Sequence, residues 1–79
     1  MTEQEKNEYR LHVSLTMNDA LSKLGEGKMT IEETMALIDE YDAKSIDSRQ
    51  HDLFEALREL APKVHRAYLR GQVRVTFER

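Results

Sequence analysis

The sequence contains no cysteine and no tryptophan, only one proline, and no long apolar run. Without cysteine, the fold has no disulfide framework, no thiolate metal site and no cysteine nucleophile. No apolar segment approaches the roughly 20 residues that span a bilayer. The opening MTEQEKNE is acidic and polar, whereas a secretory signal is basic and then apolar. We therefore expect a cytoplasmic protein without a membrane segment.

The length predicts one domain, residues 1–79, in which the polar residues 1–7 form a disordered leader. A hydrophobic fraction of 39% with 34% charged residues is typical of a folded domain. A chain of this size buries only roughly 60–65% of the surface that it exposes when unfolded. Because no disulfide can add to such a small core, association with a partner or a second copy is the remaining source of stability.

The charge is unevenly distributed along the chain. Residues 63–79 contain five Lys and Arg residues and one Glu, whereas the other 62 residues contain seven Lys and Arg residues and fourteen Asp and Glu residues. The formal net charge of −3 therefore combines an acidic body with a basic C-terminal end. This distribution bears on binding partners rather than on the fold.

Residues 9–17 support two interpretations. Apolar and polar residues alternate without exception, which is typical of a strand with one buried face. A helix competes, because one helical stripe contains Tyr9, Val13, Met17, Ala20, Leu21 and Leu24. The helix would leave Leu11 and Leu15 on the polar side. We favour a strand over residues 9–16 followed by a short helix over residues 18–24, because Thr16 and Asn18 are good N-caps.

The middle of the chain predicts two further helices. The GEGK turn ends the first helix, and Thr30 with Glu33 forms a capping box that opens the second. The third helix begins near Asp47 or Ser48, kinks or restarts at Pro62, and ends at Gly71. Its apolar face consists of Leu53, Leu57, Leu60, Val64 and Tyr68.

The last residues, QVRVTFER, alternate again and predict a closing strand from residue 72. Within the chain only residues 9–16 can pair with it. The expected fold class is therefore α+β and helix-dominated, with short N- and C-terminal strands flanking three helices. The alternative is an all-α three-helix bundle with a C-terminal extension.

Residue patterns that carry catalysis are missing from the sequence. It has no nucleophile elbow, no phosphate-binding glycine loop and no HExxH motif. His51 and Asp52 are sequence neighbours, which do not face each other on a helix. The acidic residues Asp39, Glu40, Asp42 and Asp47 lack the spacing and the glycine of a calcium loop. We expect no enzyme activity, no cofactor and no metal.

A two-stranded sheet leaves both strands at an edge, which favours pairing with another chain. The predicted function is therefore that of a non-catalytic regulatory, adaptor or inhibitor protein, acting by protein–protein interaction as a homodimer. The predicted contact residues are Val73, Arg74, Val75, Phe77 and Arg79. The alternative is a nucleic-acid-binding regulator, because arginine forks match phosphate geometry. Its predicted contacts are Lys63, Arg66, Arg70 and Arg74.

Overall fold

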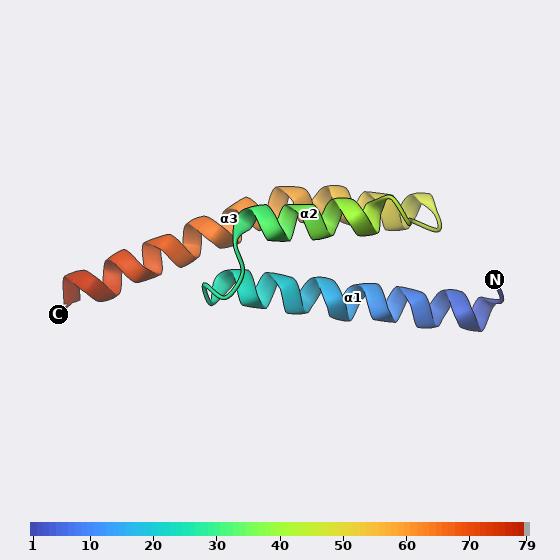
Figure 1. Ribbon diagram of the computed structural model, residues 1–79, viewed down its shortest axis with the longest axis horizontal. Coiled ribbons are helices and arrows are strands. Elements are labelled where there is room, and N and C mark those ends of the chain that lie inside the picture. Colours follow the sequence, from blue (N-terminus) through green and yellow to red (C-terminus); the bar gives the residue numbers. More distant parts are fainter. Residues whose placement is uncertain (79) are drawn as a thin grey trace.

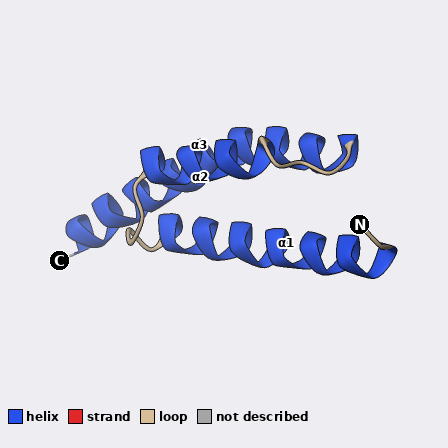
Figure 2. Cartoon of the chain, turned by 45° about the vertical axis from the view of Figure 1, so that its right-hand side comes forward, coloured by secondary structure: helices blue, strands red, loops and turns tan. Residues whose placement is uncertain are grey.

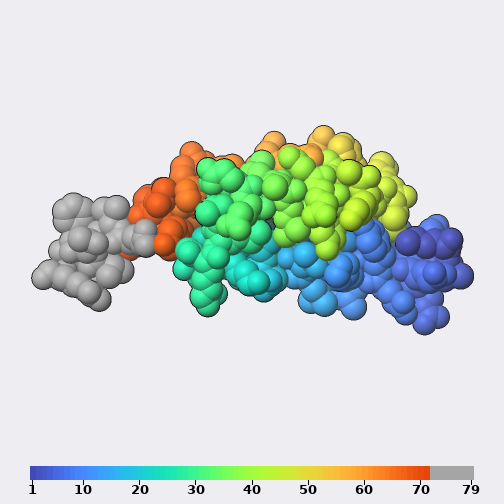
Figure 3. Space-filling model, viewed as in Figure 1, coloured from blue at the N-terminus to red at the C-terminus, as the bar shows by residue number. Residues whose placement is uncertain are grey.

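The computed structural model describes the backbone of residues 1–78 and the side chains of residues 1–71. The chain forms three α-helices, α1 (Glu3–Gly25), α2 (Ile31–Asp42) and α3 (Ser48–Glu78). Figure 1 shows that α2 runs antiparallel to both α1 and α3, and that the C-terminal part of α3 extends past the loop between α1 and α2. The molecule is a narrow rod (Figure 3), and its extents are 55 × 18 × 16 Å.

The predicted α+β fold is wrong, and the alternative all-α bundle is the fold of this chain. Residues 1–78 contain helices and loops and no strand (Figure 2). The predicted strand over residues 9–16 lies within α1, and residues 72–78 continue α3 in place of the predicted closing strand. The predicted contact residues Val73, Arg74, Val75, Phe77 and Arg79 lie outside the residues whose side chains the structure describes.

Helix α1 forms because one of its stripes is buried along most of its length. The stripe contains Val13, Met17, Ala20 and Leu24, each no more than 3% exposed. A strand would bury Leu11 and Leu15 together with Val13, but both leucines are 60% exposed. Continuity with Ala20 and Leu24 therefore outweighs the local alternation, because only a helix places all four buried residues on one face.

A capping box opens α1 earlier than the sequence predicted. The Thr2 hydroxyl accepts a hydrogen bond from the Glu5 amide at 3.1 Å, and the Glu5 carboxylate accepts one from the Thr2 amide at 3.1 Å. Two of the amides that a helix start leaves unpaired are thereby satisfied. Residues 3–7, for which the sequence predicted a disordered leader, form the first turns of α1.

The capping box predicted for α2 is confirmed. The Thr30 hydroxyl and the Glu33 carboxylate each accept a hydrogen bond from the other residue's amide at 3.0 Å. These hydrogen bonds lower the pKa of Glu33, because the backbone amide of Thr30 stabilises the carboxylate. The cap places Thr34 and Ile38 on the buried face of α2.

Helix α3 begins at Ser48, as predicted, where the Asp47 carboxylate accepts a hydrogen bond from the Gln50 amide at 2.9 Å. Pro62 neither ends nor restarts the helix. It has no amide hydrogen to donate to the Arg58 carbonyl, and the axis of α3 changes direction in its orange part in Figure 1. Gly71 also lies within the helix, so the predicted C-terminal stop is absent.

The core lies along the common axis of the three helices. The three largest fully buried side chains are Phe54, Leu24 and Ile38, one from each helix. Full burial of one such side chain contributes about 1.5–3 kcal/mol. No helix in the described part of the chain has the length and apolar character of a membrane span.

Two glycines are expected to respond oppositely to replacement by alanine. Gly27 has a φ of 76°, and a Cβ there would overlap the Tyr68 ring, whereas a Cβ at Gly71 would meet no atom. We expect Gly27→Ala to lower the free energy of unfolding by about 1–3 kcal/mol. Gly71→Ala should raise it by about 0.5–1 kcal/mol, because alanine is the better helix former. Urea unfolding followed by circular dichroism measures both, and destabilisation by Gly71→Ala would contradict the helical backbone there.

Candidate interaction surface

Several leucines lie outside the core, on outward-facing parts of the bundle. Leu11 and Leu15 are one turn apart on α1 and are each 60% exposed. Leu53 and Leu60 lie two turns apart on α3 and are 41% and 43% exposed. Leu69, farther along α3, is 43% exposed. Isolated exposed leucines are common on protein surfaces, but pairs that repeat along one helix face are the pattern by which a helix binds another helix.

A shallow pocket of about 320 Å³ lies between α1 and the start of α3, with Leu53 at its side. Arg10 and Asp47 line it and form an ion pair, with Arg10 Nη2 2.9 Å from Asp47 Oδ2. The ion pair holds α1 to the loop that precedes α3. The hydrogen bond from the Gln50 amide and the ion pair with Arg10 both lower the pKa of Asp47.

The basic residues predicted to contact anions lie together on the outward side of α3. Lys63, Arg66 and Arg70 are exposed, and none forms an ion pair within 4.0 Å with a side chain among residues 1–71. His65 and Tyr68 point elsewhere, into a pocket of about 340 Å³ that also contains the start of α2. The side chain of Arg74 is outside the described residues.

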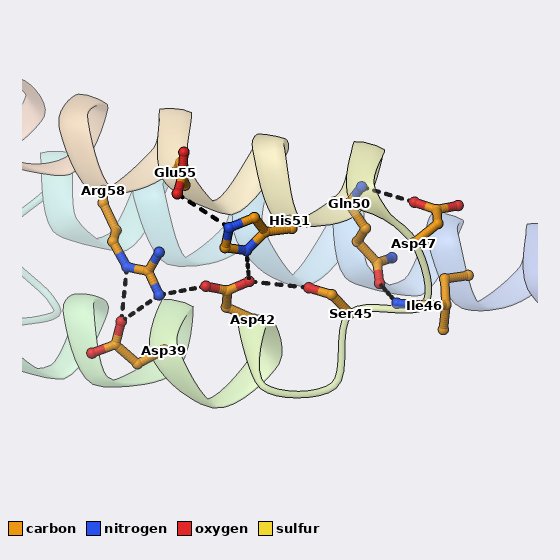
Figure 4. A network of polar contacts seen from close by, with 9 residues as sticks. All are labelled: Asp39, Asp42, Ser45, Ile46, Asp47, Gln50, His51, Glu55 and Arg58. Carbon is orange, nitrogen blue, oxygen red and sulfur yellow. Dashed lines mark hydrogen bonds and ion pairs between the residues drawn. The ribbon is translucent and has the colours of Figure 1, made fainter.

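A polar cluster joins the end of α2 to the first turns of α3 (Figure 4). Asp42 is its centre. Its carboxylate lies 2.8 Å from His51 Nδ1, accepts a hydrogen bond from Arg58 Nη2 at 2.6 Å, and accepts another from the Ser45 hydroxyl at 3.1 Å. Arg58 also donates through Nε to Asp39 at 2.9 Å, and His51 Nε2 lies 3.1 Å from Glu55.

The geometry of this cluster favours charged side chains. Carboxylates only accept hydrogen bonds. His51 therefore forms a hydrogen bond with each of its two carboxylate neighbours only when both of its ring nitrogens carry a proton. The hydrogen bond to Asp42 accordingly raises the pKa of His51. The hydrogen bonds from His51 and Arg58 lower the pKa of Asp42 from 3.8 to about 2.

The cluster is better suited to holding helices together than to catalysis. Because Asp42 occupies one ring nitrogen of His51 and Glu55 the other, neither is left to accept a proton from a substrate. The sequence suggested only Asp52 as a carboxylate near His51, and these two neighbours do not face each other on a helix, whereas the fold brings Asp42 to His51. Among residues 1–71 no three His, Asp or Glu side chains are arranged as ligands for a metal ion.

The chain matches no protein-family model, no curated protein and no solved structure. Its function is therefore inferred from the chemistry of its own surfaces. The sequence pattern predicted that the basic residues of α3 lie on one edge of a helix. It also predicted that Leu11 and Leu15 lie on the buried face of a strand. The competing helical stripe contains neither of these two leucines, and it is therefore the signal that identifies them as exposed.

The pH dependence of stability should reveal the polar cluster. The pKa of His51 is raised on folding. The protonated imidazole therefore stabilises the fold fully below the ordinary histidine pKa of about 6.5, and this stabilisation is lost as the pH rises through the pKa of the folded state. We expect the melting temperature to fall as the pH rises above about 6.5, and to fall less in His51→Gln. Thermal unfolding by circular dichroism measures this. His12→Gln is the matched control, since the His12 ring lies near the rings of Tyr9 and Tyr41 and forms no ion pair with a carboxylate among the described side chains. Equal pH profiles for His51→Gln and the wild type would contradict the assignment.

Proposed function

We propose that this chain is a non-catalytic regulatory or adaptor protein that acts by binding other protein chains through its helix faces, as a homodimer. The observation that supports this most directly is the exposure of Leu11 and Leu15 on α1 and of Leu53 and Leu60 on α3. Each pair repeats at a helical spacing, so each helix presents an apolar row that the fold itself does not cover.

The narrow shape of the bundle supports the same proposal. A rod 18 × 16 Å in cross-section has room for little more than one line of core side chains. Burying the exposed leucines against another helix would stabilise the complex by roughly 25 cal/mol for each Å² of apolar surface removed from water. An interface thus supplies stability that 79 residues do not readily generate alone. A cytoplasmic location remains a prediction from the sequence.

The proposal is tested by site-specific cross-linking. A photoreactive amino acid at position 15 should form adducts with particular proteins in an extract of the cells that make this chain. The matched control is position 36, which is also exposed but lies on α2. Because both leucines are exposed, Leu11→Gln combined with Leu15→Gln should change the free energy of unfolding by no more than about 0.5 kcal/mol for each residue. It should nevertheless abolish the adducts formed from a probe at position 14. Identical adducts from positions 15 and 36 would contradict a specific surface on α1.

Binding to nucleic acid is the second candidate, and the observation that favours it is the uncompensated charge of Lys63, Arg66 and Arg70 on one edge of α3. If these three side chains each contact a phosphate, the logarithm of the affinity should fall with the logarithm of the salt concentration with a slope of about −2.7. Arg70→Glu should reduce that slope by about one. Fluorescence polarisation with duplex and single-stranded oligonucleotides measures both, and no binding at low salt excludes this candidate.

A further inference from the structure

The outward face of α3 carries a continuous row of exposed residues that no other helix of the chain covers. The spacings along the row alternate between three and four, which is the pattern of the contact seam between two packed helices. The row contains two leucines, two alanines and two long basic side chains. Its members are Leu53, Ala56, Leu60, Lys63, Ala67 and Arg70, all exposed. We call this row the α3 seam.

The charges in and beside the α3 seam are segregated along the helix. Between residues 52 and 70 the first half of this face carries three acids, Asp52, Glu55 and Glu59, and the second half carries the three bases Lys63, Arg66 and Arg70, while the exposed Arg49 lies one turn before this stretch. Apart from the contact of Glu55 with His51, none of the six forms an ion pair within 4.0 Å among the described side chains. The face therefore presents separate negative and positive halves.

We infer that the α3 seam binds the α3 seam of a second copy of this chain, with the two helices antiparallel. This inference rests on the proposed function and names its partner. Around a two-fold axis between residues 61 and 62, Leu53 faces Arg70, Ala56 faces Ala67, and Leu60 faces Lys63 of the second copy. A two-fold interface requires this reciprocity, in which residue i contacts residue j and residue j contacts residue i.

The order of the charges selects the antiparallel direction. Antiparallel helices bring Asp52 near Arg70 of the second copy, and Glu59 near Lys63 and Arg66, so that each of these two acids meets a base and each contact occurs twice by symmetry. Parallel helices would instead place Glu59 beside Glu59 and Arg66 beside Arg66, which is repulsive. A different protein would have to present three bases followed by three acids at the same spacing, and α3 of a second copy does so when its direction is reversed.

The side chains of the α3 seam also suit a close contact. Ala56 and Ala67 face each other and are small enough to let the two helix backbones approach. The aliphatic stem of Lys63 can lie along Leu60 of the second copy while its ammonium group stays near Glu59. From residue 53 to residue 70 the seam is about 26 Å long. The contact would cover Leu53 and Leu60 but not Leu11 and Leu15, which remain available to another protein.

Charge reversal at the centre of the interface tests this inference. We expect the wild type to have about twice its monomer mass of 9.3 kDa by light scattering behind size exclusion. Glu59→Lys and Lys63→Glu should each weaken the dimer about tenfold or more, because two symmetric attractions become repulsions. An equimolar mixture of the two variants should dimerise again. In the mixed dimer the lysine introduced at position 59 of one chain faces the glutamate introduced at position 63 of the other, and the two remaining wild-type charges are also matched.

The matched control is Glu40→Lys on α2. Glu40 is also exposed and has a lysine four residues later, at 3.9 Å, so the substitution makes the same change of charge away from the α3 seam. It should leave the dimer unchanged. Circular dichroism shows whether each variant is folded. A mixture of folded Glu59→Lys and Lys63→Glu that stays monomeric would overturn the inference.

Cysteine pairing tests the direction of the helices independently, because the chain has no cysteine of its own. When Ala56→Cys and Ala67→Cys proteins are mixed and oxidised, an antiparallel dimer should yield mainly the disulfide between positions 56 and 67. Disulfides joining position 56 to 56 and 67 to 67 would overturn the antiparallel arrangement. A wild type that stays at 9.3 kDa up to about 1 mM would overturn self-association. Specific cross-links from position 15 would in that case still support the binding of other proteins through α1, so the failure of self-association can be distinguished from the failure of that part of the proposed function.

Discussion

Burial of one apolar stripe from each helix on a shared axis is the constraint on which the rest of the structure depends. Leu24, Ile38 and Phe54 meet there with almost no exposure to water. Because the bundle has only three helices, each helix buries one face against its neighbours and leaves its outward face in solvent. The outward faces are therefore free to carry a function, and they carry the exposed leucines and the segregated charges.

The polar contacts determine how the helices are positioned against one another, rather than whether each helix forms. Asp42 receives hydrogen bonds from His51 and Arg58 of α3 and so joins the end of α2 to the start of α3. The ion pair of Arg10 with Asp47 holds α1 to the adjoining loop. These groups lie near the surface, where each contact contributes little by itself. Together they set the alignment of α3, and therefore the direction in which the α3 seam faces.

A single interpretation connects the small core with the pattern on α3. The chain is too short to cover all of its apolar residues, and the same helix carries acids in one half of its outward face and bases in the other. A second copy in reversed orientation would cover the leucines of the α3 seam and neutralise both halves. The leucines of α1 would remain outside that contact, which allows the dimer to bind a further protein.

Local signals in the sequence were sufficient for the start of α2, where Thr30 and Glu33 form the predicted capping box, and for the start of α3 beside Asp47. Capping depends on residues three apart, so the sequence contains the whole interaction. Residues 9–17 were different, because their alternation fits a strand while Val13 and Met17 also belong to a helical stripe. Only packing against α2 and α3 decides which of the two patterns is buried. The same holds for Asp42 and His51, which lie nine residues apart in two helices: no local rule pairs them, and only the turn between α2 and α3 brings the carboxylate to the imidazole.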